Sequence, residues 1–431
     1  MAERGPLAGA TLELDIGGPA HGGSCVARHE GRAVFVRHAL PGERVRALVT
    51  EDRGGSYCFA DAVEVLTASP DRVEPPCPHA GPGRCGGCDW QHASAQAQRV
   101  LKETVIREQF TRLARFELGD LLAGVEALPG GLLGWRSRIL WALDDRPGTD
   151  GGHGLRRHRS HTVEQLDHCP LAQPAIAAFP STGELTPRAT GLEQVAGDGD
   201  ETTLLVHTPG GGRQARGRRP PDRVRVVRGP EVLHHEVDGR SFGVQAGGFW
   251  QVHPAAAATF VDALLAAVAP GPGERVLDLY AGAGLLTAAL ADAVGPLGAV
   301  LGVESSAAAV GDAEANLAHL PQARVQRARV TAESLVAPDG PLDPAAERFD
   351  VVVLDPPRAG AGREVMQALL DHAPRAIGYV ACDPAALARD VAVARSAGWR
   401  LTSVRAFDAF PMTHHVECVA RLEPPAANPG P

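Results

Sequence analysis

Three side chains in the C-terminal part of the chain could do covalent chemistry: one thiol and two carboxylates. Cys382 lies in "GYVACDP", directly after an apolar run and directly before a helix-like stretch. Asp355 follows a second apolar run in "VVVLDPPR", and Glu417 opens a third in "HHVECVARL". A thiol becomes a nucleophile when its pKa is lowered, whereas most free cysteines are small buried hydrophobic residues. Cys382 is a candidate nucleophile, and not only a packing residue, if the fold brings it close to Asp355 and Glu417.

The elements around these residues alternate between strands and helices. From about residue 241, mostly alanine-rich helical stretches separate seven apolar runs: 275–281, 299–304, 323–330, 349–355, 376–382, 401–407 and 414–422. This alternation predicts a doubly wound, mostly parallel α/β sheet. Residues 408–413 are too few for a crossover helix, so the last strand should run antiparallel. Asp355, Cys382 and Glu417 are then expected at one edge, where ligands of such sheets bind.

A small-molecule site is predicted at the same edge. The first strand ends in "DLYAGAG", where Gly282 and Gly284 let the backbone approach a ligand. Glu304, after the second strand, can accept hydrogen bonds from both hydroxyls of a ribose. A nicotinamide fingerprint requires a third glycine where this chain has Thr287, so the motif favours S-adenosylmethionine over NAD. A plain tight turn followed by a helix-starting Glu304 is the alternative.

A methyl donor, a thiol and a carboxylate suit one reaction in particular. C5 of uracil is too weak a nucleophile to take a methyl group directly, but addition of a thiolate to C6 makes C5 enolate-like. A base must then remove the C5 proton so that the thiol can leave. N-methylation would need neither Cys382 nor Glu417. Enzymes that methylate exocyclic amines carry a similar Pro-Pro turn followed by an aromatic residue, where this chain has Arg358.

The chain resembles the bacterial class I RNA uracil-5-methyltransferases with an N-terminal TRAM domain over nearly its whole length. The likeness rests on "DLYAGAG", "GVE", "LDPPR", "YVACDPAALARD", "FPMTHHVECV" and "GGFWQVHP". It implies Cys382 as the nucleophile and Glu417 as the general base. It also implies that the methyl donor is contacted by Gln251, Tyr280, Glu304 and Asp355. The chain departs from the family at Asp383 and His253, where Asn is usual, and at Ala281, where Cys is usual. A carboxylate at Asp383 opposes thiolate formation unless it points away.

Four cysteines form a second candidate site. Cys77, Cys85 and Cys88 lie within twelve residues, and Cys169 follows in "DHCPL". This spacing predicts a metal site, and four thiolates suit either tetrahedral zinc or a cubane cluster. Similar family members carry a [4Fe-4S] cluster on matching cysteines, so the resemblance implies iron and sulfur, with zinc as the alternative. A thioredoxin-like redox pair is disfavoured because no βαβ pattern surrounds the cysteines.

The chain divides into three regions. Residues 1–68 hold short alternating segments broken by Gly-Gly and Pro-Gly, which predicts a small OB-like β-barrel, and they resemble an RNA-binding TRAM domain. Residues 69–240 predict an irregular α+β domain with the cysteine cluster and a basic RNA-binding surface. Residues 241–431 are the expected Rossmann-like methyltransferase domain.

Charge and aromatic content bear on the RNA partner. The net charge of -9 argues mildly against nucleic acid, but local basic faces attract phosphates. Arginines crowd the central region at Arg136, Arg138, Arg156, Arg157, Arg159 and within residues 209–223, a stretch that predicts a loop. Aromatic residues make up only 4% of the chain, so base stacking should be local, with Trp90, Trp135 or Phe249 as candidates.

We therefore expect an enzyme that flips a uridine out of folded ribosomal or transfer RNA and methylates C5. Two alternatives stay open: a methyltransferase of another RNA base or substrate, and a non-catalytic RNA-binding protein. No run of about 18 apolar residues and no signal-peptide pattern occurs, which predicts a cytoplasmic protein without membrane contact. Nothing in the sequence indicates an obligatory protein partner.

Overall fold

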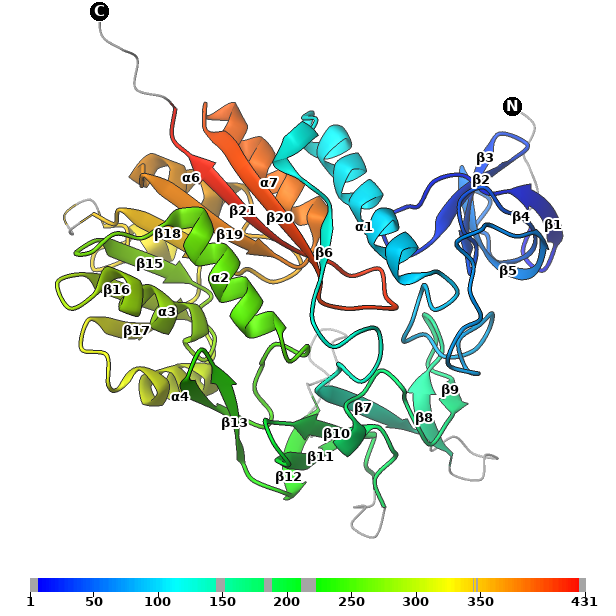
Figure 1. Cartoon of the computed structure of the whole chain (residues 1–431), viewed down its shortest axis with the longest axis horizontal. Helices are drawn as coiled ribbons and strands as arrows, with labels where there is room; N and C mark the ends of the chain where they lie inside the picture. The colour runs from blue at the N-terminus through cyan, green and yellow to red at the C-terminus, as the bar shows by residue number, and fades with distance from the viewer. Residues whose placement is uncertain are drawn as a thin grey trace, which may run out of the picture.

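The computed structural model describes residues 7–144, 152–181, 188–210, 222–343, 345 and 348–425. The chain forms three parts, each built on its own sheet (Figure 1). In this view the N-terminal part lies to the right of the large C-terminal part, and the central part lies below both. Most of the arginine-rich loop predicted at 209–223 falls on residues 211–221, which lie outside the described residues.

The N-terminal part confirms the predicted small barrel. Its five strands pair in the order β1-β4-β5-β3-β2. They are β1 (Thr11–Asp15), β2 (Cys25–His29), β3 (Arg32–Arg37), β4 (Arg44–Glu51) and β5 (Tyr57–Thr67). Exposed and buried positions alternate along β1 and β4, as expected for strands with one buried face. Cys25, Val34 and Val45 are fully buried in the core of this part.

The central part is more regular than the irregular α+β domain that we expected. Its antiparallel strands follow the order β12-β11-β10-β7-β8-β9. They are β7 (Arg138–Leu143), β8 (His153–Arg156), β9 (Val163–Gln165), β10 (Gly191–Ala196), β11 (Thr202–Thr208) and β12 (Arg223–Arg228). Strand β10 shows no alternating sequence pattern because all six of its residues are buried, including the charged Glu193. Glu193 is tolerated there because Arg138 Nη1 donates to it at 2.9 Å and His207 Nε2 lies 2.7 Å away.

The C-terminal part is the predicted doubly wound sheet, in the order β17-β16-β15-β18-β19-β21-β20-β6. A hairpin of β13 (Val232–Val237) and β14 (Arg240–Gln245) leads into it. Its strands from the C-terminal region are β15 (Arg275–Leu279), β16 (Ala299–Glu304), β17 (Ala323–Arg327), β18 (Val351–Leu354), β19 (Ala376–Ala381), β20 (Arg400–Asp408) and β21 (Glu417–Glu423). The last strand, β21, runs antiparallel between β19 and β20, which confirms the prediction from the short connection.

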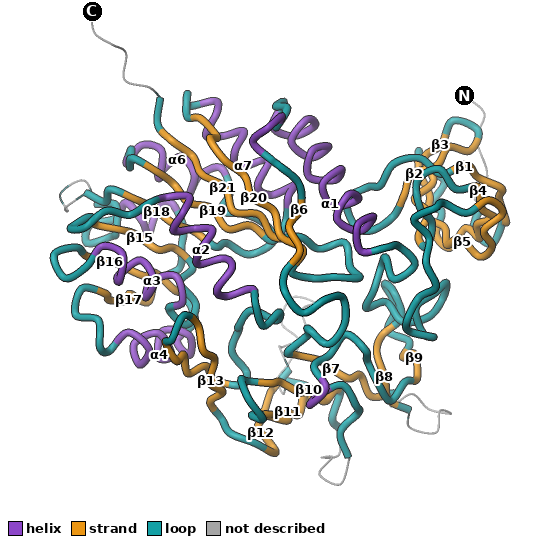
Figure 2. Tube along the Cα trace, in the orientation of Figure 1, coloured by secondary structure: helices purple, strands orange, loops and turns teal. Residues whose placement is uncertain are grey.

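Helices cover both faces of this sheet (Figure 2). They are α2 (Ala256–Val268), α3 (Leu285–Val294), α4 (Ala307–Leu317), α5 (Ala332–Val336), α6 (Arg363–His372) and α7 (Pro384–Ser396). Alternate residues of β18 enter two separate cores: Val351 and Val353 enter one, and Val352 and Leu354 the other. Strands buried on both faces explain the near-continuous apolar runs of the sequence. Over the described residues, no helix has both the length and the apolar character needed to cross a membrane.

Two elements from the central region lie with the C-terminal sheet. Strand β6 (Val125–Ala127) pairs in parallel with β20 as the edge strand. Helix α1 (Ala95–Gln109) packs against α7 and β6. Chain before residue 241 therefore helps to build the part that carries Cys382 and Glu417.

Candidate active site

A cavity of about 1540 Å³ lies at the carboxyl ends of the parallel strands. It is lined by all seven residues predicted for catalysis and donor binding: Gln251, Tyr280, Gly282, Glu304, Asp355, Cys382 and Glu417. The fold therefore brings together residues that are up to 166 positions apart, since ligands of such sheets bind at this edge. The central part contributes Trp135, Arg136 and Arg138 to the same cavity. The individual roles of these residues stay predictions.

The turn after β15 shapes one end of the cavity. Tyr280 has a φ of 65° and Gly282 a φ of 55°, both in the left-handed region. The strained Tyr280 backbone is fixed because its N–H donates to Val303 O at 2.9 Å. A side chain at Gly282 would meet no atom within 4 Å, so the backbone is open to a ligand on this side.

Glu304 is fixed at the end of β16 by three backbone N–H groups. Its Oε1 accepts from Ser305 N at 2.6 Å and from Ser306 N at 2.7 Å, and its Oε2 accepts from Gly282 N at 3.2 Å. These bonds join the glycine turn to the acidic residue of the next strand. The two predicted halves of a ribose-binding site are therefore one hydrogen-bonded unit.

Burial favours the neutral, protonated form of two carboxyl groups near the turn, Asp278 and Asp355. Burial raises the pKa of Asp278 to about 7, although Thr287 Oγ1 donates to its Oδ2 at 2.6 Å. Burial and the charge of Asp278 raise the pKa of Asp355 to about 7. Thr287, which excluded the nicotinamide fingerprint, thus supports the side chain beneath the glycine turn.

The electrostatics at Cys382 oppose a free thiolate. Burial, then the carboxylates of Glu417 and Asp355, raise the pKa of Cys382 to about 12, while Arg358 lowers it. Glu417 is only 5% exposed, and burial followed by the charge of Asp355 raises its pKa well above the ordinary value. A positive charge bound in this cavity would lower the pKa of both groups.

Asp383, the departure that mattered most in the sequence, is the N-cap of α7. Its Oδ1 accepts from Ala386 N at 2.8 Å, and His21 Nε2 lies 3.0 Å from its Oδ2. Burial alone would raise the pKa of Asp383, but His21, the Ala386 N–H and Arg389 lower it. Both oxygens are thus engaged outside the cavity, whose lining includes Cys382 but not Asp383.

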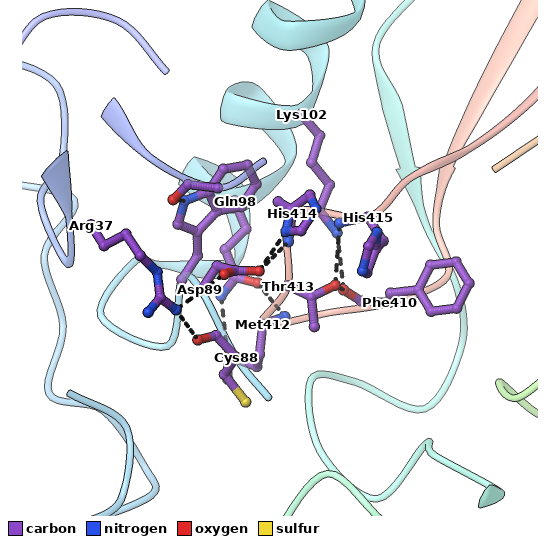
Figure 3. Close-up of polar contacts among 12 residues, drawn as sticks. Arg37, Cys88, Asp89, Gln98, Lys102, Phe410, Met412, Thr413, His414 and His415 are labelled. Atoms are coloured by element: carbon purple, nitrogen blue, oxygen red, sulfur yellow. Dashed lines mark hydrogen bonds and ion pairs between the residues drawn. The ribbon is translucent and has the colours of Figure 1, made fainter. Parts of the chain in front are cut away.

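The loop between β20 and β21, residues 409–416, precedes Glu417 and is held by a buried polar network (Figure 3). His414 Nδ1 lies 2.6 Å from Asp89 Oδ2, and Arg37 of the barrel donates to Asp89 Oδ1 at 3.3 Å. Burial alone would raise the pKa of Asp89, but His414 and Arg37 lower it to about 2. Met412, at a φ of 68°, accepts at its carbonyl from Asp89 N at 2.9 Å.

Helix α1 holds the other end of this loop. Lys102 Nζ donates to Asp408 Oδ1 at 2.5 Å. It also donates to Phe410 O at 3.1 Å, and Gln98 Oε1 accepts from Met412 N at 2.7 Å (Figure 3). Sequence reasoning missed these residues. The available signal was their spacing, because Gln98 and Lys102 lie at i and i+4 within the stripe that also buries Leu101 and Val105.

The four cysteines lie around a separate small cavity. It is lined by Cys77, Cys85, Cys88 and Cys169 and also by Arg136, which reaches the large cavity as well. Two thiols accept hydrogen bonds: Gln91 Nε2 donates to Cys88 Sγ at 3.0 Å and Gly87 N to Cys85 Sγ at 3.4 Å. Within the part of the chain that is described, no three His, Cys, Asp or Glu side chains are arranged to hold a single metal ion.

The predicted stacking residues fare differently. Trp90 is 1% exposed and its Nε1 donates to Gly23 O at 3.1 Å, so the expectation that it stacks on RNA is wrong. Trp135 is buried against His253, with which it stacks at 6.1 Å, and it reaches the cavity wall. Phe249 is 70% exposed at the cavity, as a stacking residue requires. Arg138, expected on the RNA surface, instead donates to the carbonyls of Ala246 and Gly248.

Comparison with known proteins decides the family. The tRNA (uracil-5-)-methyltransferase family model matches residues 236–424, and the TRAM domain model matches residues 7–63. A 23S rRNA (uracil(1939)-C(5))-methyltransferase RlmD from Alkalilimnicola ehrlichii is 35% identical over 95% of this chain and 96% of its own length. The chain belongs to the RNA uracil-5-methyltransferase family. It is an S-adenosylmethionine-dependent enzyme that methylates C5 of uridine in RNA.

Two other proteins extend this comparison. An uncharacterized RNA methyltransferase from Streptomyces avermitilis is 46% identical over 97% of this chain and 99% of its own. The crystal structure of Pyrococcus abyssi tRNA (uracil-54, C5)-methyltransferase with S-adenosyl-L-homocysteine covers 95% of this chain and 100% of its own, with a TM-score of 0.67 and 21% identity. This last similarity shows a shared fold for the three parts together.

Proposed function

We propose that Cys382 is the nucleophile and Glu417 the general base of the methylation. The Cys382 thiol first loses its proton, and the thiolate sulfur bonds to C6 of the uracil while the electrons of the C5–C6 double bond move toward O4. C5 then takes the methyl group from the sulfonium, whose bond to that methyl breaks. Glu417 removes the proton from C5, the sulfur leaves C6, and the C5–C6 double bond forms again. The meeting of Cys382 and Glu417 at one cavity carries this proposal.

Donor binding follows from the arrangement at the other side of the cavity. We assign the ribose hydroxyls to Glu304, whose carboxylate is joined to the glycine turn by Gly282 N, and the open backbone at Gly282 leaves room for the donor. Tyr280 and Gln251, which also line the cavity, are the other proposed donor contacts. Asp355 follows β18, which lies between β15 and β19 in the order of the strands. A sulfonium placed near Asp355 offsets the carboxylate charges that raise the pKa of Cys382.

We propose ribosomal RNA as the target. The relatives named 23S rRNA methyltransferases share 34–35% identity with the chain over 95% of its length, whereas the tRNA enzyme of known structure shares 21%. The test is to map 5-methyluridine in the ribosomal and transfer RNA of cells with and without this protein. Loss of one 5-methyluridine from 23S rRNA is expected. Loss from transfer RNA alone would overturn this target.

The barrel carries a surface suited to unpaired bases. Phe35, Tyr57 and Phe59 form a cluster on β3 and β5, with ring centroids 5.5–5.9 Å apart. Tyr57 is 51% exposed, and the guanidinium of Arg159 lies 4.7 Å from the Phe59 ring centroid. Aromatic rings beside arginine are the usual platform for bases of single-stranded RNA. We place the RNA contact of the barrel on this cluster.

We also propose that the four cysteines hold a [4Fe-4S] cluster. Four thiols around one cavity fit this group, in which each thiolate binds a different iron, and N–H donors to Cys85 and Cys88 are typical of cluster sulfurs. The cluster would stabilise the segment that also carries Asp89. Cysteines stay reduced in the cytoplasm, where we place the protein. Iron and acid-labile sulfide in the protein purified without oxygen, lost on Cys85→Ser, test this proposal, and one zinc per chain would contradict it.

A further inference from the structure

A loop of the N-terminal barrel reaches the catalytic end of the C-terminal sheet. This barrel loop, residues 16–24, joins β1 to β2. Its His21 lies 3.0 Å from Asp383 and, between ring centroids, 6.5 Å from His414. Its position is fixed by Trp90, whose Nε1 donates to Gly23 O. A Cβ at Gly23 would lie 2.8 Å from Asp89 Cγ, so the loop packs tightly on the network that holds residues 409–416.

His21 contacts the residue that follows the nucleophile. Asp383 has two oxygens, and α7 uses only Oδ1, through Ala386 N. The partner of Oδ2 is His21, which comes from a different part of the chain. The side chain of Asp383 is therefore held by two donors that lie away from the cavity.

This contact bears on the thiol because Asp383 is one of three carboxylates that oppose ionisation of Cys382. Glu417 and Asp355 line the cavity with Cys382, and the proposed reaction uses the first of them. Asp383 has no such task. A hydrogen bond from His21 offsets its charge and fixes its direction, which favours the thiolate.

We propose that His21 is a positioning residue for Cys382: it holds the Asp383 carboxylate on α7 and away from the thiol. The N-terminal barrel thereby completes the catalytic centre in addition to binding RNA. This inference rests on the proposed role of Cys382 as the nucleophile.

The test uses the full-length protein and two readouts. The first is alkylation of Cys382 by iodoacetamide at fixed pH, followed by mass spectrometry of the Cys382 peptide, which needs no RNA. The second is formation of a covalent adduct with RNA that carries 5-fluorouridine, at saturating RNA and donor, because fluorine at C5 blocks the final elimination. RNA affinity is measured separately. The variants are His21→Ala, His21→Gln and Asp383→Asn, and His29→Ala at the other end of β2 is the control.

We expect His21→Ala to slow both reactions about tenfold, the effect of about 1.4 kcal/mol on a rate. His21→Gln, which keeps an N–H donor, should stay within about twofold of the wild type, and His29→Ala should leave alkylation unchanged. In the Asp383→Asn background His21→Ala should have no further effect, because Asn still caps α7 but carries no charge.

Two results would overturn the inference. One is that His21→Ala weakens RNA binding but leaves both rates unchanged. The other is that His21→Ala slows alkylation equally with Asp383 and with Asn at that position. If His21→Ala slows alkylation as expected while wild-type protein forms no adduct with the fluorinated RNA, the positioning role holds and the proposed uridine chemistry fails.

Discussion

Replacing Lys102 with Met should destabilise the catalytic part strongly. The Lys102 side chain is 0% exposed and Asp408 is 2% exposed, with 2.5 Å between Nζ and Oδ1. Burial lowers the pKa of Lys102 and Asp408 opposes this, so the pair is ionic only because both charges are present. Met fills a similar volume but leaves the Asp408 carboxylate buried without a cation. Breaking a buried pair in this way costs about 3–5 kcal/mol.

The assay is thermal unfolding of the full chain at neutral pH. For a unit of roughly 200 residues, about 2–4 °C accompany each kcal/mol, so the midpoint should fall by roughly 6–20 °C. Asp408→Asn added to Lys102→Met removes the orphan charge and should recover most of this loss. The reasoning is refuted if Lys102→Met melts within about 2 °C of the wild type. It is refuted equally if the double variant is as unstable as the single one.

Three other outcomes follow from the site. The pKa of Asp278 is about 7 in the folded protein, against an ordinary value of 3.8. The protonated carboxyl therefore contributes about 4 kcal/mol to the stability of the folded state below pH 4, and this contribution is lost as the pH rises through 7. Asp278→Asn should flatten the decline of the urea-unfolding midpoint with pH, and an unchanged slope would contradict this. Tyr57→Ala and Phe59→Ala should each weaken binding of single-stranded RNA by about 1–3 kcal/mol in filter binding without changing donor affinity, whereas equal affinities would remove the cluster from RNA recognition. S-adenosylmethionine should speed iodoacetamide alkylation of Cys382 relative to S-adenosylhomocysteine, which has the same shape but no sulfonium charge, by roughly tenfold or more; equal rates would exclude the electrostatic effect.

The sequence predicted the edge of the sheet well because its signals are local. Apolar runs end at Leu279, Leu354 and Ala381, and the next residues face the cavity by the topology of a parallel sheet. The short connection predicted at 408–413, which the structure has at 409–416, also predicted the direction of β21 correctly. These features need only strand order and connection length.

The contacts missed from the sequence depend on distant pairs. Strand β10 could not be recognised from the sequence because it buries Glu193, whose partners Arg138 and His207 lie on the two neighbouring strands. Lys102 and Asp408 are 306 positions apart, so neither residue alone shows that the other neutralises it. A buried charge is readable only once its partner is known.

Asp383 illustrates the same limit at the active site. Its neighbour Cys382 suggested a conflict of charge, whereas the structure shows that Asp383 caps the start of α7. Its second oxygen, Oδ2, contacts His21. This residue comes from the barrel, so the contact could not be assigned from sequence spacing.

The most direct measurement of the central claim is denaturing electrophoresis of the protein with RNA and donor carrying a labelled methyl group. Glu417→Gln should accumulate a covalent protein–RNA species that contains the label, because the methyl transfers but the C5 proton stays. Cys382→Ala should form no such species and no methylated RNA. Asp383→Asn, run alongside, should turn over without trapping the adduct. Labelled RNA released by Cys382→Ala, or normal turnover by Glu417→Gln with trapping by Asp383→Asn, would contradict the assigned roles.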